Sequence, residues 1–278
     1  MGIIDAHAHL WERAKTPQHW IDPTTMPSVD RDFTLIDLEH MQVQAGVDAS
    51  ILVQSTNSIR ETVDLLAMAA RSDRILGVIG WVNLEKDVAS QVAALRAGVG
   101  GDALVGIRHL AQEETDRQWL AKQSVDLDAV SACGLPFDLV LHPDQLAHAE
   151  TLVASHPRTS FVLDHLGNPP VASGDLRAWR RDMSRIARHG NVVVKLSGIT
   201  LQTTWDDWSV DDLREPVETA LEMFGTDRVV FGTDWPLVLL AADAPSWVDI
   251  VRALTPGESH EAILSANARR LYLGDDVA

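Results

Sequence analysis

Residues 1–10 of the chain read MGIIDAHAHL, a short apolar segment that leads directly into Asp5, His7 and His9. Side chains alternate between the two faces of a β-strand, so these three residues are expected to share one face, with the intervening alanines on the other. The Cβ atoms of His7 and His9 would then lie roughly 7 Å apart, near enough for both imidazoles to bind one metal ion. Two histidines at a polar strand end can also be purely structural, and this segment alone leaves that alternative open.

Further short runs rich in β-branched and aromatic residues recur along the whole chain. Their mostly continuous hydrophobicity is typical of strands buried on both faces of a parallel sheet, and helix-like segments separate them. Alternating strands and helices in this number predict an α/β fold, a (β/α)8 TIM barrel that uses residues 1–278 as a single domain. The strands are expected at residues 3–4, 51–53, 76–79, 105–107, 137–141, 161–163, 192–194 and 229–231, with helices at 62–71, 88–97, 127–132, 143–154, 176–188 and 213–224.

An open, doubly wound sheet is the alternative architecture. No strand is followed by the G-x-G-x-x-G turn that binds dinucleotide phosphates, and eight strands favour a closed barrel. Residues 11–33 contain several prolines and little periodicity. They are expected to form a long loop that covers the active site.

The composition excludes several classes of protein. A net charge of −17 opposes binding to nucleic-acid phosphates and to anionic membrane surfaces, which leaves a small-molecule substrate as the expected partner. The single cysteine, Cys133, rules out an intramolecular disulfide and is expected to be a buried, unreactive thiol. With no recognisable secretion signal or membrane span, we expect a soluble, cytoplasmic protein, and a homo-oligomer is left open.

The expected strand ends carry polar residues in a pattern that suggests chemistry. Active sites of such barrels lie at the C-terminal ends of the strands. Any single polar residue there can be structural, but their joint occurrence on six strands is hard to obtain by chance. The set comprises Asp5, His7 and His9 on the first strand, Arg108 and His109 on the fourth, His142 on the fifth, Asp164 and His165 on the sixth, Lys195 on the seventh and Asp234 on the eighth.

At these residues the sequence resembles the amidohydrolase superfamily (amidohydrolase family 2), and within it the branch of sugar-lactone and 2-pyrone-4,6-dicarboxylate lactonases. The resemblance spans nearly the whole chain. It rests on DAHAHLW (5–11), GIRHLAQ (106–112), LPFDLVLHP (135–143), FVLDHLGNPP (161–170), VVVKLSGI (192–199), the block from Trp208 to Pro236, and NARRLY (267–272).

The resemblance implies one divalent metal ion. It assigns His7, His9, His142 and Asp234 as ligands, a set of three imidazoles and a carboxylate that suits Zn²⁺. Many superfamily members hold two metals with a carboxylated lysine on the fourth strand, but residues 106–109 contain no lysine, so one ion is expected. Some relatives in this branch are expected to hydrolyse lactones without metal, and the requirement for the ion is therefore left open.

The resemblance also implies catalytic and substrate-binding roles. Asp234 would take a proton from the attacking water and pass it to the leaving alkoxide, and His165 would lie near the water or the substrate. His142 and Lys195 join them as catalytic residues, with Lys195 as a cation beside the carbonyl. Arg108 and His109 would donate hydrogen bonds to substrate oxygens. Trp11 and Trp235 would stack on a sugar ring, as would Trp20, Trp205 and Trp208, although each indole could equally pack the loops together.

These expectations favour hydrolysis of a small aldonolactone by water attack on the lactone carbonyl, with Asp234 as the general base. A non-oxidative decarboxylase, or another amidohydrolase acting on a small carboxylated substrate, is the alternative enzyme. A catalytically silent barrel is disfavoured because Asp234 and all the histidines are present. The identity of the lactone, its stereochemistry and its ring size are left open.

Overall fold

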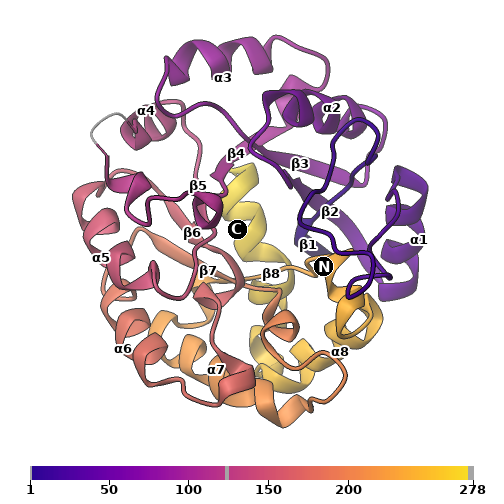
Figure 1. The fold of residues 1–278 in the computed structure, drawn as a ribbon, viewed down its shortest axis with the longest axis vertical. Helices are drawn as coiled ribbons and strands as arrows, with labels where there is room; N and C mark the ends of the chain where they lie inside the picture. The colour runs from indigo at the N-terminus through magenta and orange to yellow at the C-terminus, as the bar shows by residue number, and fades with distance from the viewer. Residues whose placement is uncertain (1, 123–124, 275–278) are drawn as a thin grey trace.

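The computed structural model describes residues 2–122 and 125–274 and contains one sheet of eight parallel strands in the order β1 to β8. Backbone hydrogen bonds from His9 N to Trp235 O (2.7 Å) and from Asp234 N to His7 O (2.8 Å) join the end of β1 to the segment after β8. The sheet thereby closes on itself (Figure 1). The strands are β1 (Ile3–Ala8), β2 (Val47–Val53), β3 (Ile75–Gly80), β4 (Leu104–His109), β5 (Phe137–Leu139), β6 (Phe161–Leu163), β7 (Val192–Leu196) and β8 (Val229–Phe231).

Helices follow the strands and form an outer ring (Figure 1). This arrangement confirms the predicted (β/α)8 barrel, with every predicted strand present. The predicted helices are present as well, and two more, α1 and α8, precede β2 and follow β8. The helices are α1 (Leu35–Ala45), α2 (Ile59–Ala69), α3 (Val88–Arg96), α4 (Leu127–Ala132), α5 (Leu146–Ser155), α6 (Arg177–Ile186), α7 (Val210–Phe224) and α8 (Ala244–Leu254).

The apolar residues form two layers, one on each side of the sheet. The larger cluster lies between the strands and the helices, and a smaller one, which includes Ile51, Ile79 and Val230, fills the interior of the barrel. Both faces of each strand are therefore buried. This double burial is the physical reason why the strand sequences read as continuous apolar runs.

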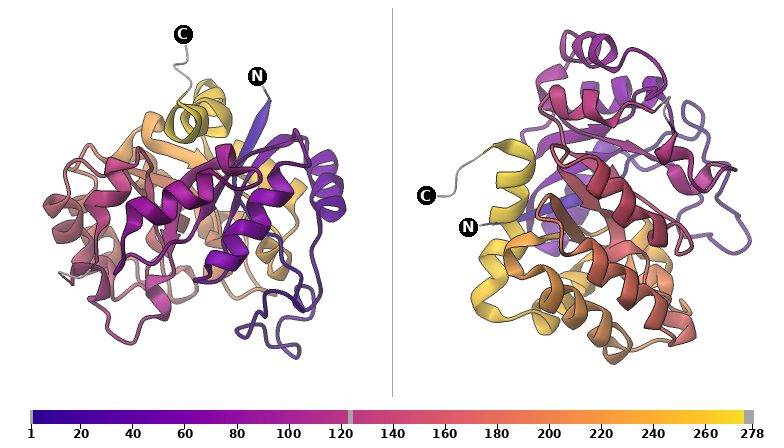
Figure 2. Two further views of the ribbon diagram at one scale, coloured as in Figure 1. Left: turned by 90° about the horizontal axis from the view of Figure 1, so that it is seen from above. Right: turned by 90° about the vertical axis from the view of Figure 1, so that its left-hand side faces the viewer.

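The two ends of the barrel differ. The C-terminal helical segment, Ala262–Ala266 with Arg269–Leu273, lies at one end, and the loop of residues 11–33 lies at the opposite end (Figure 2). Tyr272 of the C-terminal segment belongs to the interior apolar cluster and so closes the N-terminal end of the barrel. The loop of residues 11–33 lies at the C-terminal ends of the strands, as the sequence predicts.

The structure bears on two further expectations, one about membrane spans and one about Cys133. None of the helices described here is long and apolar enough to cross a membrane. Cys133, expected to be buried, is partly exposed at the end of α4. The expectation was wrong because this thiol follows a short surface helix and only its inner side packs on the core.

Candidate active site

The two histidines of β1 converge as the spacing predicts. His7 Nε2 lies 3.1 Å from His9 Nε2, and His9 Nδ1 lies 2.8 Å from the carbonyl oxygen of Val53, at the end of β2. Asp5 does not join them. Its carboxylate accepts hydrogen bonds from the backbone N–H and the hydroxyl of Thr233 and from the backbone N–H of His7. The pairing of β1 with β2 is irregular between Asp5 and Ala8, so simple alternation does not hold there.

Asp234 completes this group from the segment after β8. One of its carboxylate oxygens, Oδ1, lies 3.6 Å from His7 Nε2 and 3.4 Å from His9 Nε2. That oxygen is buried and has no hydrogen-bond partner among the described residues. The backbone of Asp234 is left-handed, with φ of 57°, a conformation that a non-glycine residue adopts only when its surroundings enforce it.

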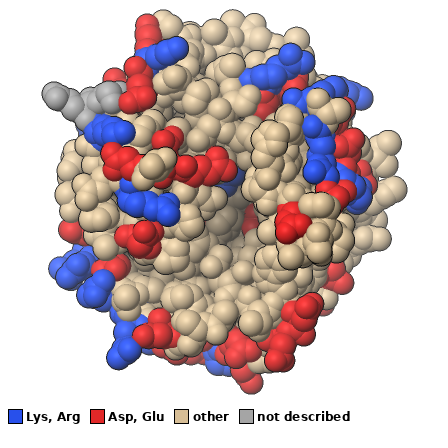
Figure 3. Space-filling model, viewed as in Figure 1, with Lys and Arg blue, Asp and Glu red and all other residues tan. Residues whose placement is uncertain are grey.

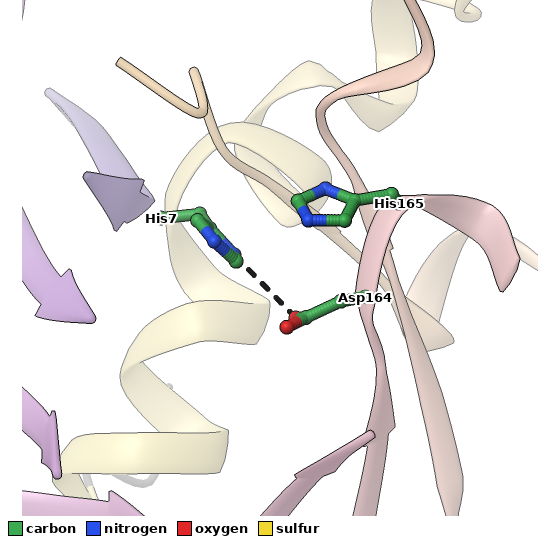
Figure 4. A group of neighbouring side chains, drawn as sticks. All are labelled: His7, Asp164 and His165. Carbon is green, nitrogen blue, oxygen red and sulfur yellow. Dashed lines mark ion pairs between the residues drawn. The ribbon is translucent and has the colours of Figure 1, made fainter. Parts of the chain in front are cut away.

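His165 approaches from the end of β6. Its Nδ1 lies 3.0 Å from Ser197 Oγ and 4.0 Å from Asp234 Oδ2, and its ring centroid is 4.7 Å from that of His7. Its backbone is also left-handed, with φ of 55°. Figure 4 shows the imidazoles of His7 and His165 side by side, with the Asp164 carboxylate facing His7. Burial lowers the pKa of both imidazoles, so they are neutral near pH 7.

A buried network of charges lies below this group. Lys195 Nζ donates to Asp138 Oδ2 and lies 3.2 Å from Asp164 Oδ1, while Arg108 Nη1 donates to Asp164 Oδ2 at 3.0 Å. Two cations therefore balance two carboxylates, which is what makes their burial tolerable. Tyr272 adds a hydroxyl that donates to Asp138 at 3.0 Å.

The carboxylates of this network titrate differently. Burial raises the pKa of Asp138 to about 6, although Lys195 acts in the opposite direction. Burial has the same effect on Asp164, but the nearby charge of Lys195 and the contact with His7 outweigh it and hold the pKa of Asp164 well below its usual range. Asp164 is therefore the ionised partner that Lys195 and Arg108 share.

The residues fit a divalent metal ion. Ligand atoms of His7, His9 and Asp234 lie within 4.8 Å of one another, as do those of His7, Asp164 and His165. The unpartnered Oδ1 of Asp234 is the kind of buried acceptor that a cation satisfies. Arg108 Nη1 also lies 3.2 Å from His7 Nε2, and an ion bound by that nitrogen would have to displace this contact.

A pocket of about 470 Å³ opens above the group at the C-terminal ends of the strands. Figure 3 shows the molecule hollowed here, with acidic side chains bordering the hollow on the side of β4 and β5. A larger hollow of about 660 Å³ lies between residues 84–86, which precede α3, residues 118–122 and 125–128, and α5, but it contains none of the strand-end residues. The site pocket is lined by His9, Trp20, Ser55, Arg108, Leu110, Gln112, Glu113, Val140, His142, Pro143, His165, Asn168, Gly198, Leu201, Gln202, Asp234 and Leu237.

The remaining residues predicted for the site occupy different places. His142 lines the pocket from the segment after β5, but it is exposed and belongs to neither of the two ligand groups. Lys195 is fully buried in the charge network and is not part of the pocket lining. Trp11 and Trp235 are buried and pack on Phe33, which leaves Trp20 as the tryptophan that lines the pocket among the described residues.

His109 also lies outside the pocket lining. Arg108 faces the interior of the barrel, and its neighbour on β4 must point to the other side because side chains alternate along a strand. Sequence reasoning did not select Asp138, Tyr272, or the amide side chains of Gln112 and Gln202. Asp138 could have been found, because a carboxylate in the middle of an apolar strand run needs a buried partner.

A parallel (β/α)8 barrel with an H-x-H motif at its first strand and an aspartate after its eighth is typical of one class of barrel hydrolases, whose active site is of a metal-binding type. The chain belongs to the amidohydrolase family: the family model described as amidohydrolase matches residues 4–273.

Several relatives resemble the chain over most of its length. An L-fucono-1,5-lactonase of Burkholderia ambifaria is 34% identical over 88% of this chain and 85% of its own. An L-fucono-1,5-lactonase of Burkholderia multivorans is 32% identical over 99% of this chain and 94% of its own. The crystal structure of an amidohydrolase from Burkholderia multivorans with bound zinc has a TM-score of 0.89 and 30% identity, covering 98% of this chain and 99% of that one.

Proposed function

We propose that the protein hydrolyses the lactone of a small sugar acid, with L-fucono-1,5-lactone and similar six-membered aldonolactones as the first candidates. The similarity to the two Burkholderia lactonases supports this assignment over most of the chain. The structural observation that carries it is the buried, unpartnered Asp234 Oδ1 beside His7 and His9 at the floor of an open pocket. A carboxylate in this place can accept a proton from water.

His7, His9 and Asp234 would hold one divalent ion, for which Zn²⁺ is the candidate, with His142 facing the same pocket. When bound, such an ion polarises a carbonyl oxygen and acidifies water. The zinc in the related Burkholderia structure supports this choice.

The residues of the chain can then be given steps. Asp234 accepts a proton from the attacking water while the water oxygen forms a bond to the lactone carbonyl carbon. The ring C–O bond breaks, the same proton passes to the departing alkoxide, and the product is a hydroxy acid. Arg108 and His165 line the pocket and face the developing negative charge on the carbonyl oxygen. Lys195 acts indirectly, because its Nζ contacts Asp164 and lies 3.3 Å from His7 Nδ1.

The pocket lining supports a polyhydroxylated substrate. Ser55, Gln112, Asn168 and Gln202 offer hydroxyl and amide groups, and Trp20 offers a flat apolar face. Ser55 Oγ already pairs with Gln18 and Glu61, and the Asn168 amide pairs with Leu141 O and Gln202 Nε2. A lactone without ring hydroxyls would therefore leave chiefly Gln112 and the side-chain oxygen of Gln202 without partners, at about 1–3 kcal/mol for each group that binding buries.

A panel of lactones tests the proposal. Hydrolysis of L-fucono-1,5-lactone and other aldonolactones, followed with a pH indicator, should exceed that of butyrolactone, simple amides and phosphotriesters by several orders of magnitude. Equal rates for butyrolactone and every sugar lactone would contradict a dedicated sugar site. Release of CO₂ from an aromatic acid, with no lactone turnover, would establish the decarboxylase alternative.

Metal analysis tests the cofactor separately. Purified protein should contain close to one equivalent of a divalent ion, His7→Ala should lose it, and chelation should slow turnover. Full activity of metal-free protein would leave the lactonase assignment intact and assign carbonyl polarisation to Arg108 and the histidines alone.

A further inference from the structure

His109, the last residue of β4, is buried in a cluster beside the pocket. Its ring is stacked on Trp119, with centroids 4.0 Å apart and planes inclined by 14°. Its Nδ1 lies 2.9 Å from Trp81 Nε1, and its Nε2 lies 2.8 Å from Glu114 Oε1. These contacts join three separate places in the chain: the end of β3, the end of β4 and the loop that follows β4.

The donors and acceptors fix the tautomer of His109. An indole N–H can only donate, so Nδ1 of His109 accepts from Trp81. The proton of the neutral imidazole is therefore on Nε2, where it donates to the Glu114 carboxylate. The His109 imidazole thus accepts the hydrogen bond of the Trp81 indole and at the same time donates one to the Glu114 carboxylate of the loop.

The loop of residues 110–122 forms one wall of the site pocket. Leu110, Gln112 and Glu113 of this loop line the pocket, although His109 itself does not. A second tie comes from Gln145, whose Nε2 donates to Ala111 O at 2.9 Å. The loop contains only short helical turns, so these side-chain ties, rather than a continuous helix, hold it in place.

We propose that His109 is a positioning residue that fixes the loop of residues 110–122 against the pocket, and so sets the affinity for substrate rather than the rate of the chemical step. This inference rests on the proposed lactonase function for its kinetic readout. If the loop is already ordered in the free enzyme, substrate binding does not have to compensate for the conformational entropy lost on ordering it, and the affinity is higher. The side-chain contacts of His109 are with Asn57, Trp81, Glu114 and Trp119 rather than with Asp234 or the histidine pair, so the proton transfer steps do not involve it.

Substitution of His109 separates this role from a catalytic one. His109→Phe keeps an aromatic ring on Trp119 but removes the polar contacts with Trp81, Glu114 and Asn57. We expect the KM for an aldonolactone to rise about tenfold with kcat within about threefold. His109→Gln supplies one acceptor and one donor and should recover much of the lost affinity. His156→Phe is the matched control, because His156 pairs with Asp128 beside the other hollow and should leave both constants unchanged.

Hydrogen exchange provides a readout that does not depend on activity. Amides of residues 110–122 should exchange faster in His109→Phe than in the unmodified protein, with the barrel strands unchanged. If His109→Phe does not fold, Trp81→Phe removes the indole donor and keeps an aromatic ring at that position, and it serves the same test. An unchanged KM with unchanged loop exchange, or a lower kcat at constant KM, would overturn the inference. Absence of lactone hydrolysis by the unmodified protein would instead overturn the proposed function, while hydrogen exchange would still test the loop contacts.

Discussion

Asp234 combines a left-handed backbone with a carboxylate that lies within 3.6 Å of two imidazoles. Asp234→Asn keeps the size of the side chain but removes its ability to accept a proton. We expect turnover of an aldonolactone to fall by about 10² or more, with the fold retained. Steady-state kinetics and circular dichroism measure the two effects. Turnover close to that of the unmodified protein would remove Asp234 from the mechanism.

Gly198 lies where the site has no room for a side chain. Its φ is +60°, and a Cβ atom built there would collide with His165 Nδ1 and Asp234 Oδ2. Gly198→Ala should therefore displace both residues and reduce turnover by about 10² or more, since small misplacements of reacting groups carry effects of this size. Gly190→Ala is the control, because nothing lies within 4 Å of a Cβ atom at that position and its backbone is not left-handed. An active Gly198→Ala enzyme would show that the arrangement of His165 and Asp234 is not rigidly required.

Residue types at the strand ends predicted much of this site from the sequence alone. His7, His9, Arg108, His165 and Asp234 all lie in or around the pocket as expected. The orientation of single side chains was harder to predict. The irregular pairing of β1 directs the Asp5 carboxylate to Thr233. Side-chain alternation along β4 directs His109 away from the pocket. These two orientations are set by the backbone and do not depend on residue type.

The first turn of α1 illustrates how single elements are stabilised. Thr34 and Asp37 form a capping box, in which the Asp37 carboxylate accepts from the backbone N–H of Thr34 at 2.9 Å. Burial opposes ionisation, but the hydrogen bonds from Thr34 and Arg31 outweigh it and hold the pKa of Asp37 below its usual value. The ionised form is therefore the one that the fold stabilises.

A pH-dependent loss of stability follows from this shift. Because the folded pKa lies below the unfolded one, the contribution of Asp37 is fully present above pH of about 4 and disappears as the pH falls through the folded pKa. Asp37→Asn should reduce the free energy of unfolding by about 0.5–1 kcal/mol at pH 7, with solvent screening keeping it small, and by less near pH 3. Urea unfolding at both pH values measures this difference. The control is Glu39→Gln, an exposed residue of the same helix, and an equal effect of both substitutions at pH 7 would contradict the capping role.

Helices differed in how well the sequence revealed them. The sequence-based helices did not include α1, whose apolar face is imperfect because Ile36 and Val43 are exposed while Gln42 is buried. Gln42 is buried because its amide donates to Ser50 Oγ and to Arg74 O, two partners that lie outside the helix. Periodicity within a helix cannot reveal partners of this kind.

At the scale of the whole molecule, the C-terminal segment supplies the floor of the barrel. Tyr272 belongs to the interior cluster and donates a hydrogen bond to Asp138, a residue of β5 that also pairs with Lys195. Through Lys195 these contacts extend to Asp164 and His7. Residues 267–272 were recognisable as part of a family resemblance, but their place beneath the site depends on closure of the whole barrel and no local pattern reports it.

Removal of the Tyr272 hydroxyl tests whether this floor stabilises the fold. Tyr272→Phe keeps the ring in the interior cluster but takes one donor from the buried Asp138 carboxylate, and a hydrogen bond to a charged group contributes about 1.5–3 kcal/mol. We expect the free energy of unfolding to fall by about that amount in urea denaturation. Tyr272→Leu should cost more, because it also removes ring packing against the interior cluster. Equal stabilities of Tyr272→Phe and the unmodified protein would mean that Lys195 alone satisfies Asp138, and that the C-terminal segment holds the barrel through apolar contacts only.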